Sequence, residues 1–95
     1  MHVILLKFGD NKASASNYLE EHNDWIAKGV SDGVFQIVGS LDIGGGFILA
    51  HGQDEQAIQD RVEADPFVKH NVVRAEVIGV DVKRTSPQLE FLLAD

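Results

Sequence analysis

The chain contains no cysteine and only two prolines in its 95 residues. Without cysteine it can form no disulfide, and it offers no thiolate to a metal ion or to nucleophilic catalysis. No apolar run reaches the roughly 18–20 residues that cross a bilayer, and the amino terminus lacks the basic segment and cleavage site of a signal peptide. We therefore expect a cytoplasmic protein with no membrane partner, forming a single domain over residues 1–95.

Basic residues are also scarce. Eight Lys and Arg stand against 15 Asp and Glu, which gives a net charge of −7, and only Lys83 and Arg84 are adjacent. Binding to a phosphate backbone needs clustered cations that displace counterions. The charge pattern therefore argues against a nucleic acid partner and favours solubility instead.

The pattern of apolar and turn residues predicts four strands and two helices. The strands are expected at residues 1–8, 34–41, 46–51 and 72–82. The first helix begins near Ser14, Ser16 or Asn17 and ends at residues 31–33, with Gly33 as its left-handed stop. The second is expected at residues 55–64, capped by Asp54 and ended by Pro66. This βαββαβ order predicts a ferredoxin-like α+β fold, in which both helices pack on one face of a four-stranded antiparallel sheet.

The strands carry apolar residues on both faces, which a sheet with one solvated face does not need. In the first strand, Ile4 and Leu6 alternate with Val3 and Leu5, and residues 47–50 have no polar face at all. An exposed apolar sheet of this size is typical of an interface. We expect a homodimer in which two sheets stack face to face. The alternative is that the apolar tail, residues 84–95, folds back over its own sheet.

A histidine interrupts the apolar stripe of the first helix. The stripe has the spacing of one helix face that packs against a core, and it consists of Tyr18, Leu19, His22, Trp25, Ile26, Gly29 and Val30. A polar side chain in such a place needs a hydrogen-bond partner. His22 should therefore have one.

Asp65 is the expected partner of His22. The two helices run antiparallel on one sheet face, so the early part of the first lies beside the end of the second, where Asp65 follows. A carboxylate on one imidazole nitrogen fixes the tautomer and leaves the other nitrogen free for proton transfer. Two plainer interpretations remain open: His22 is a satisfied core histidine, and Asp65 only ends its helix or pairs with Arg61.

The sequence also suggests residues for a small-molecule pocket, and it argues against a metal site and a phosphate-binding loop. Apolar walls with few polar groups are the usual composition of small-molecule sites, and the expected substrate-binding residues are Phe67, Trp25, Phe35 and Ser40. The remaining histidines show no metal-ligand spacing, so no metal is expected. The glycines at 44–46 open a strand rather than a helix and have no Gly-Lys-Ser/Thr after them, which indicates a hairpin and not a phosphate loop.

These residues resemble the YciI-like (YCII-related) family over nearly the whole chain. The family pattern places a single histidine on the first helix, where this chain has His22. A strand end at residues 39–41, a glycine-rich hairpin at 44–47 and the tripeptide Asp65-Pro66-Phe67 follow in the family's order. The resemblance implies a dimeric α+β barrel with the pair His22 and Asp65 facing a cleft. It also implies lyase-like or isomerase-like chemistry, since such relatives include a dehydrochlorinase and an isomerase.

The chain departs from that family pattern at two positions. Leu19 stands where an arginine is common, three residues before the histidine, and Ser40 stands where proline is common. The missing cation would weaken binding of an anionic ligand.

The sequence thus predicts a small enzyme in which His22 is a general acid/base and Asp65 orients it. The expected reaction is elimination or isomerisation of a small cyclic, enolic or phenolic compound, and it needs no cofactor where the substrate delocalises charge. The alternative is a non-catalytic module of the same fold that binds a small metabolite or only dimerises.

Overall fold

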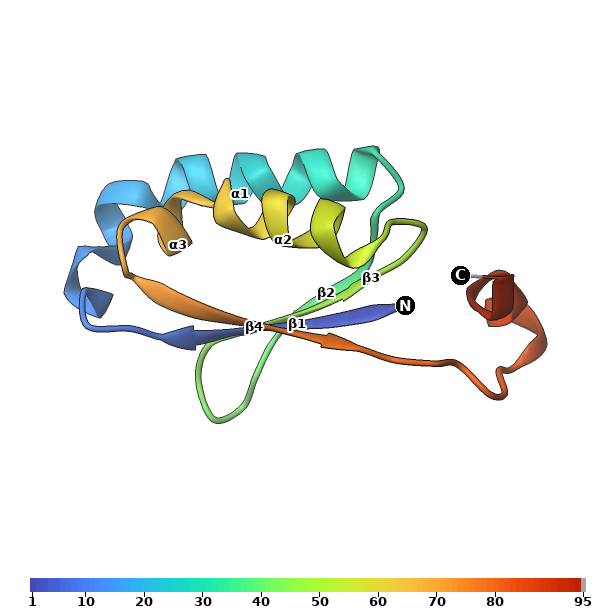
Figure 1. Ribbon diagram of the computed structural model, residues 1–95. Coiled ribbons are helices and arrows are strands. Elements are labelled where there is room, and N and C mark those ends of the chain that lie inside the picture. Colours follow the sequence, from blue (N-terminus) through green and yellow to red (C-terminus); the bar gives the residue numbers. More distant parts are fainter. Residues whose placement is uncertain (95) are drawn as a thin grey trace.

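The computed structural model describes residues 1–94 and contains one antiparallel sheet with helices on one of its faces (Figure 1). The elements are β1 (His2–Phe8), η1 (Lys12–Ser14), α1 (Ala15–Ser31), β2 (Phe35–Ser40), β3 (Gly46–Ala50), α2 (Glu55–Glu63), α3 (Pro66–Lys69), β4 (Val73–Gly79) and η2 (Pro87–Ala94). The strands lie in the order β2-β3-β1-β4. The predicted ferredoxin-like α+β fold is confirmed.

Local signals define several boundaries as expected. Gly33 takes a φ of 76° after α1, the left-handed conformation that ends a helix at little cost for glycine. Asp54 caps α2, because its side chain accepts a hydrogen bond from the Ala57 amide at 2.8 Å. At the start of α1, Ser14 stands at the cap position without capping the helix. Its hydroxyl lies 2.8 Å from Oδ1 of Asn11 instead.

Pro66 has a different role from the one expected. It does not end α2, which stops at Glu63 with Ala64 as its C-cap, but opens the short helix α3. Proline is favoured at the first helical position because its missing N–H has no helical partner there. Asp65 is the N-cap of α3, and its Oδ1 accepts a hydrogen bond from the Phe67 amide at 3.1 Å.

An irregularity in β2 changes which of its side chains face the helices. The pairing runs Phe35 with Ala50 and then Ile37 with Leu49, so one residue is extra between Phe35 and Ile37. A bulge of this kind reverses the alternation of side chains beyond it. Ser40, opposite Gly46, therefore shares the helix-facing side with Phe35.

The helix-facing side of the sheet carries the core. Fully or almost fully buried side chains from β1, β2, β3 and β4 pack there with residues of α2 and α3; they include Ile4, Leu6, Phe35, Ile48, Ala50, Ile58, Val62, Phe67 and Val73. The register places Val3, Leu5, Phe47 and Leu49 on the other side, together with Ile37 and Ile78. The helices cover one face of the sheet. The open face is mostly apolar but also carries Lys7, Glu76 and Arg74 at the end of β1 and the start of β4.

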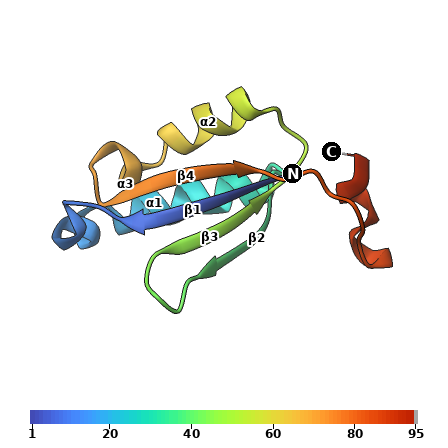
Figure 2. The same ribbon diagram turned by 60° about the horizontal axis from the view of Figure 1, so that its bottom comes forward.

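The carboxyl-terminal tail does not lie over the open face. It continues beyond the end of β4, and η2 lies past the end of the sheet at which β1 begins (Figures 1 and 2). The ring of Phe91 meets His51 there edge-on, with 5.0 Å between the ring centroids. Asp95, the last residue of the expected tail, lies outside the described residues. Within residues 1–94, no helix is both long and apolar enough to span a membrane.

Candidate functional site

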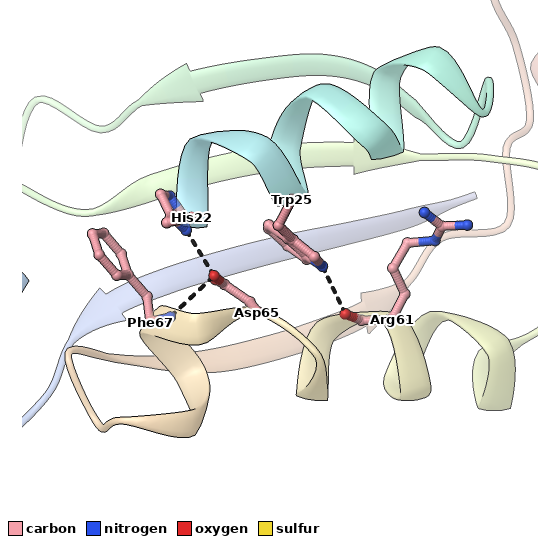
Figure 3. Close-up of polar contacts among 5 residues, drawn as sticks. All are labelled: His22, Trp25, Arg61, Asp65 and Phe67. Atoms are coloured by element: carbon pink, nitrogen blue, oxygen red, sulfur yellow. Dashed lines mark hydrogen bonds and ion pairs between the residues drawn. The ribbon is translucent and has the colours of Figure 1, made fainter. Parts of the chain in front are cut away.

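His22 and Asp65 form a buried hydrogen-bonded pair between α1 and the start of α3 (Figure 3). The imidazole Nδ1 lies 2.8 Å from Oδ1 of Asp65. Asp65 is completely buried and His22 is 8% exposed. The antiparallel packing of the two helices brings them together from positions 43 residues apart in the chain.

The hydrogen bonds of Asp65 indicate which nitrogen of His22 carries the proton. Oδ1 also accepts the Phe67 amide, so this oxygen acts as an acceptor. A carboxylate has no proton to donate, so the tautomer that satisfies this contact with a carboxylate carries its proton on Nδ1 of His22. The other nitrogen, Nε2, makes no hydrogen bond with any of residues 1–94, which leaves its lone pair available.

Aromatic contacts fix the plane of the His22 ring. The ring stacks on Phe67 with 3.9 Å between centroids and 6° between planes. One turn earlier, Tyr18 stacks on His70 at 4.0 Å, so two parallel ring pairs join α1 to the α3 segment. The Trp25 indole donates to the Arg61 carbonyl oxygen at 2.9 Å (Figure 3). The orientation of His22 is thus set by packing on its face as well as by Asp65.

A cleft of about 410 Å³ opens beside His22. It lies between α1 and the helix-facing side of β1, β2 and β3, and Phe67 of α3 also lines it. Its lining consists of Leu6, Phe8, Leu19, His22, Asn23, Ile26, Val38, Gly39, Ser40, Gly45, Gly46, Phe47, Ile48, Phe67 and Val73. A volume of this size lies in the range of about 300–1,000 Å³ that is usual for small-molecule sites.

Three of the six site residues expected from the sequence line this cleft: His22, Phe67 and Ser40. Asp65 is fully buried and does not line the cleft itself, but it is hydrogen-bonded to two residues that do, His22 and Phe67. Trp25 and Phe35 do not line it, contrary to the expectation that they form its walls. Phe35 is core, and Trp25 meets it edge-on with 5.1 Å between centroids. Trp25 extends from α1 towards α2, where its indole contacts the Arg61 carbonyl oxygen (Figure 3).

Three further residues of α1 line the cleft: Leu19, Asn23 and Ile26. The sequence drew attention to Leu19 only as a departure from the family pattern and named neither Asn23 nor Ile26 as a site residue. The three residues lie at positions −3, +1 and +4 from His22. Residues three or four positions apart are neighbours on a helix surface, so Leu19 and Ile26 lie beside His22. That signal was available, but Leu19 and Ile26 belong to the apolar stripe and suggested core. Asn23 lies next to the stripe, and the sequence analysis gave it no role.

One oxygen of the pair has no protein partner. Oδ2 of Asp65 is buried and forms no hydrogen bond within the described part of the chain. A buried polar atom left unsatisfied costs stability, and such costs are often found at functional sites. No three His, Asp or Glu side chains in residues 1–94 come together as a metal ion would need.

The fold and the site together describe an α+β protein with a hydrogen-bonded His–Asp pair beside an apolar cleft. The chain belongs to the YCII-related domain family, whose model matches residues 1–80. It is similar to the solved structure of 5-chloro-2-hydroxyhydroquinone dehydrochlorinase from Burkholderia phenoliruptrix, determined in complex with 2,5-dihydroxybenzoquinone. The TM-score is 0.67 at 15% identity, over 84% of this chain and 93% of that one. At this identity the likeness shows a shared fold. No curated protein sequence matches the chain.

Proposed function

We propose that this protein is a small enzyme in which His22 transfers protons as a general acid/base and Asp65 orients it. One observation carries the proposal: the same imidazole is hydrogen-bonded through Nδ1 to a buried carboxyl group and lines a cleft. A base held in one tautomer with its second nitrogen available is the arrangement that proton transfer needs. The stack on Phe67 adds support because it holds the ring in one plane.

The chemistry follows from the two nitrogens. Nε2 takes a proton from a carbon or hydroxyl of the substrate, and the imidazolium that forms is stabilised by the Asp65 carboxylate at Nδ1. The electron pair left on the substrate is delocalised over an enol or phenol system. Isomerisation is completed when Nε2 returns the proton to another carbon. Elimination is completed when that electron pair forms a double bond and an anionic leaving group departs.

The substrate class we propose is a small cyclic, enolic or phenolic compound. Substrates of this kind delocalise the charge themselves, so the base needs no cofactor. The structural relative from Burkholderia phenoliruptrix is a dehydrochlorinase of a chlorinated hydroxyhydroquinone, which is a compound of this type. The fold that the two proteins share is what supports the comparison.

Exchange of ring protons for deuterium tests the proposal without knowledge of the natural substrate. Resorcinol is a ring with two hydroxyls whose ring protons exchange slowly in D₂O through a keto form, and NMR follows their loss. We expect the protein to accelerate this exchange and the change His22→Gln to remove the acceleration, which for a positioned base is about 10²–10⁴-fold. Val30→Ala, at an exposed position of α1 outside the cleft, is the matched control.

The outcomes separate catalysis from binding. Equal exchange rates with the native protein and with His22→Gln would contradict the catalytic role. If resorcinol still binds the native protein, the site is then a metabolite-binding module. If it does not bind, the pair His22–Asp65 serves structure alone.

We also propose that the protein is a homodimer whose sheets stack through their open faces. The exposed or half-exposed apolar side chains of that face support this; they are Val3, Leu5, Ile37, Phe47, Leu49 and Ile78. The β2–β3 hairpin projects on the same side (Figure 1), and Ile43 within it is 88% exposed. Apolar side chains gathered on one exposed sheet face are typical of an interface, and the charged side chains of that face, Lys7, Arg74 and Glu76, lie towards one end of β1 and β4.

Sedimentation at micromolar concentration tests the dimer. We expect the native chain to sediment as a dimer and Leu49→Glu to sediment as a folded monomer, because a charge would be buried without a partner between the sheets. Val30→Glu, on the helical side, should remain dimeric. A monomeric native chain would contradict the stacked-sheet arrangement.

A further inference from the structure

The cleft beside His22 contains no charged side chain. Among residues 1–94, the residues that line it are apolar or glycine apart from three polar ones: His22, Asn23 and Ser40. No Lys, Arg, Asp or Glu is among them. An ionised group that leaves water for such a site must find an opposite charge or pay a large desolvation cost. The composition of the walls therefore disfavours a charged ligand.

Leu19 occupies the wall position one turn before His22 on α1. It lines the cleft and is 49% exposed, so its side chain meets both the ligand space and solvent. Lys12, the cation closest in sequence to this part of α1, rests on the ring of Phe8 at 4.3 Å from the centroid and does not line the cleft. The net charge of −7 adds a field that repels anions.

The polar atoms of the cleft are suited to hydroxyl or carbonyl groups. The Asn23 amide can donate and accept, and so can the Ser40 hydroxyl. Neither side chain forms a hydrogen bond with another of the described residues. They reach the cleft from opposite walls, Asn23 from α1 and Ser40 from the end of β2. The volume of about 410 Å³ accommodates one ring with a few substituents.

We propose that the cleft selects uncharged hydroxylated rings and discriminates against carboxylated ones, and that Leu19 determines this selectivity. Asn23 and Ser40 hold the ring hydroxyls, and His22 contacts the ring from α1. This inference rests on the proposed function for the location of the site, but it concerns binding and not the proton transfer.

A matched pair of probes tests the selectivity: resorcinol, and dihydroxybenzoate, which is the same ring with an added carboxylate. Dissociation constants come from titrations followed by backbone amide NMR. For the native protein we expect dihydroxybenzoate to bind at least about tenfold more weakly, because its charge finds no partner in the cleft. Leu19→Arg supplies that partner through a charge-assisted contact and should improve dihydroxybenzoate binding by about tenfold or more.

The control is Val30→Arg, since Val30 is an apolar residue of α1 that is 52% exposed and does not line the cleft. It changes the net charge equally and should leave the ratio of the two affinities unchanged. Equal or tighter binding of dihydroxybenzoate by the native protein overturns the inference, and so does an unchanged ratio in Leu19→Arg. Failure of both probes to bind also overturns it.

The same titrations distinguish this inference from the catalytic proposal. His22→Gln should still prefer resorcinol, since the preference comes from Leu19. If the preference for resorcinol persists while His22→Gln leaves the rate of deuterium exchange unchanged, only the catalytic role fails. If exchange depends on His22 but the anion binds as well as resorcinol, only the selectivity fails.

Discussion

Removal of the Asp65 carboxylate should destabilise the protein in proportion to the hydrogen bonds it accepts. The change Asp65→Ala deprives two donors of their acceptor: Nδ1 of His22 at 2.8 Å and the Phe67 amide at 3.1 Å. A hydrogen bond to a charged group contributes about 1.5–3 kcal/mol, and loss of an N-cap costs about 0.5–2 kcal/mol. Loss of the unsatisfied Oδ2 offsets part of this. We expect a net loss of roughly 2–4 kcal/mol in the free energy of unfolding.

Asp65→Asn separates the hydrogen bonds from the charge. The asparagine oxygen can accept from both donors and still cap α3, because Asn is as good an N-cap as Asp. Only the charge-assisted part of the contact is lost. We expect a loss of about 1 kcal/mol or less.

Chemical denaturation at a fixed protein concentration measures both variants, since the unfolding of a dimer depends on concentration. Glu63→Ala, an exposed acidic residue at the end of α2, is the control for charge removal. If Asp65→Asn lowers the free energy of unfolding as much as Asp65→Ala does, the negative charge of Asp65 and not its hydrogen bonds stabilises this region. If Ala costs nothing measurable, the pair does not stabilise the fold and the geometric reasoning is refuted.

Three further predictions follow from individual positions. Gly29→Ala should lower the free energy of unfolding by about 1 kcal/mol or more, because the alanine methyl would collide with the Phe35 ring. This cost exceeds the gain from the higher helix propensity of alanine. A variant that chemical denaturation shows to be stabilised would contradict the prediction. Gly46→Ala should fold normally, since a Cβ there has no neighbour nearer than 3.7 Å, yet weaken resorcinol binding because Gly46 lines the cleft; unchanged affinity would place the ligand elsewhere. The hydrogen bond from Arg61 lowers the pKa of Asp32. The Asp32 carboxylate therefore contributes to stability above about pH 4, and this contribution is lost as the pH falls further. Asp32→Asn should flatten that part of the curve of stability against pH, and an unaltered curve would refute the prediction.

The order of elements could be predicted from the sequence because each boundary has a local cause. Gly33 ends α1 and Asp54 begins α2 through contacts within a few residues of each. The role of Pro66 could not be settled locally, because a proline that disfavours continuation of one helix also favours the start of another. Only the positions of Asp65 and Phe67 in space decide between the two.

The site could be predicted in its centre but not at its edges. The contact of His22 with Asp65 follows from helix periodicity and antiparallel packing. Ser40 reaches the cleft only because the bulge after Phe35 reverses the side-chain alternation of β2, and no feature of the sequence indicates that bulge. Trp25 was misplaced because a helix stripe does not specify which part faces a cleft and which part faces another helix.

The most direct test of the account is the state of the His22 ring in the presence of a ligand. Nitrogen-detected NMR of the imidazole, with and without resorcinol, reports which nitrogen carries the proton and which one senses the ligand. The account predicts a proton on Nδ1, a free Nε2, and a shift of the Nε2 resonance when resorcinol occupies the cleft. A proton on Nε2, or an Nε2 resonance that stays unchanged while the Asn23 amide shows saturation by resorcinol, would contradict it.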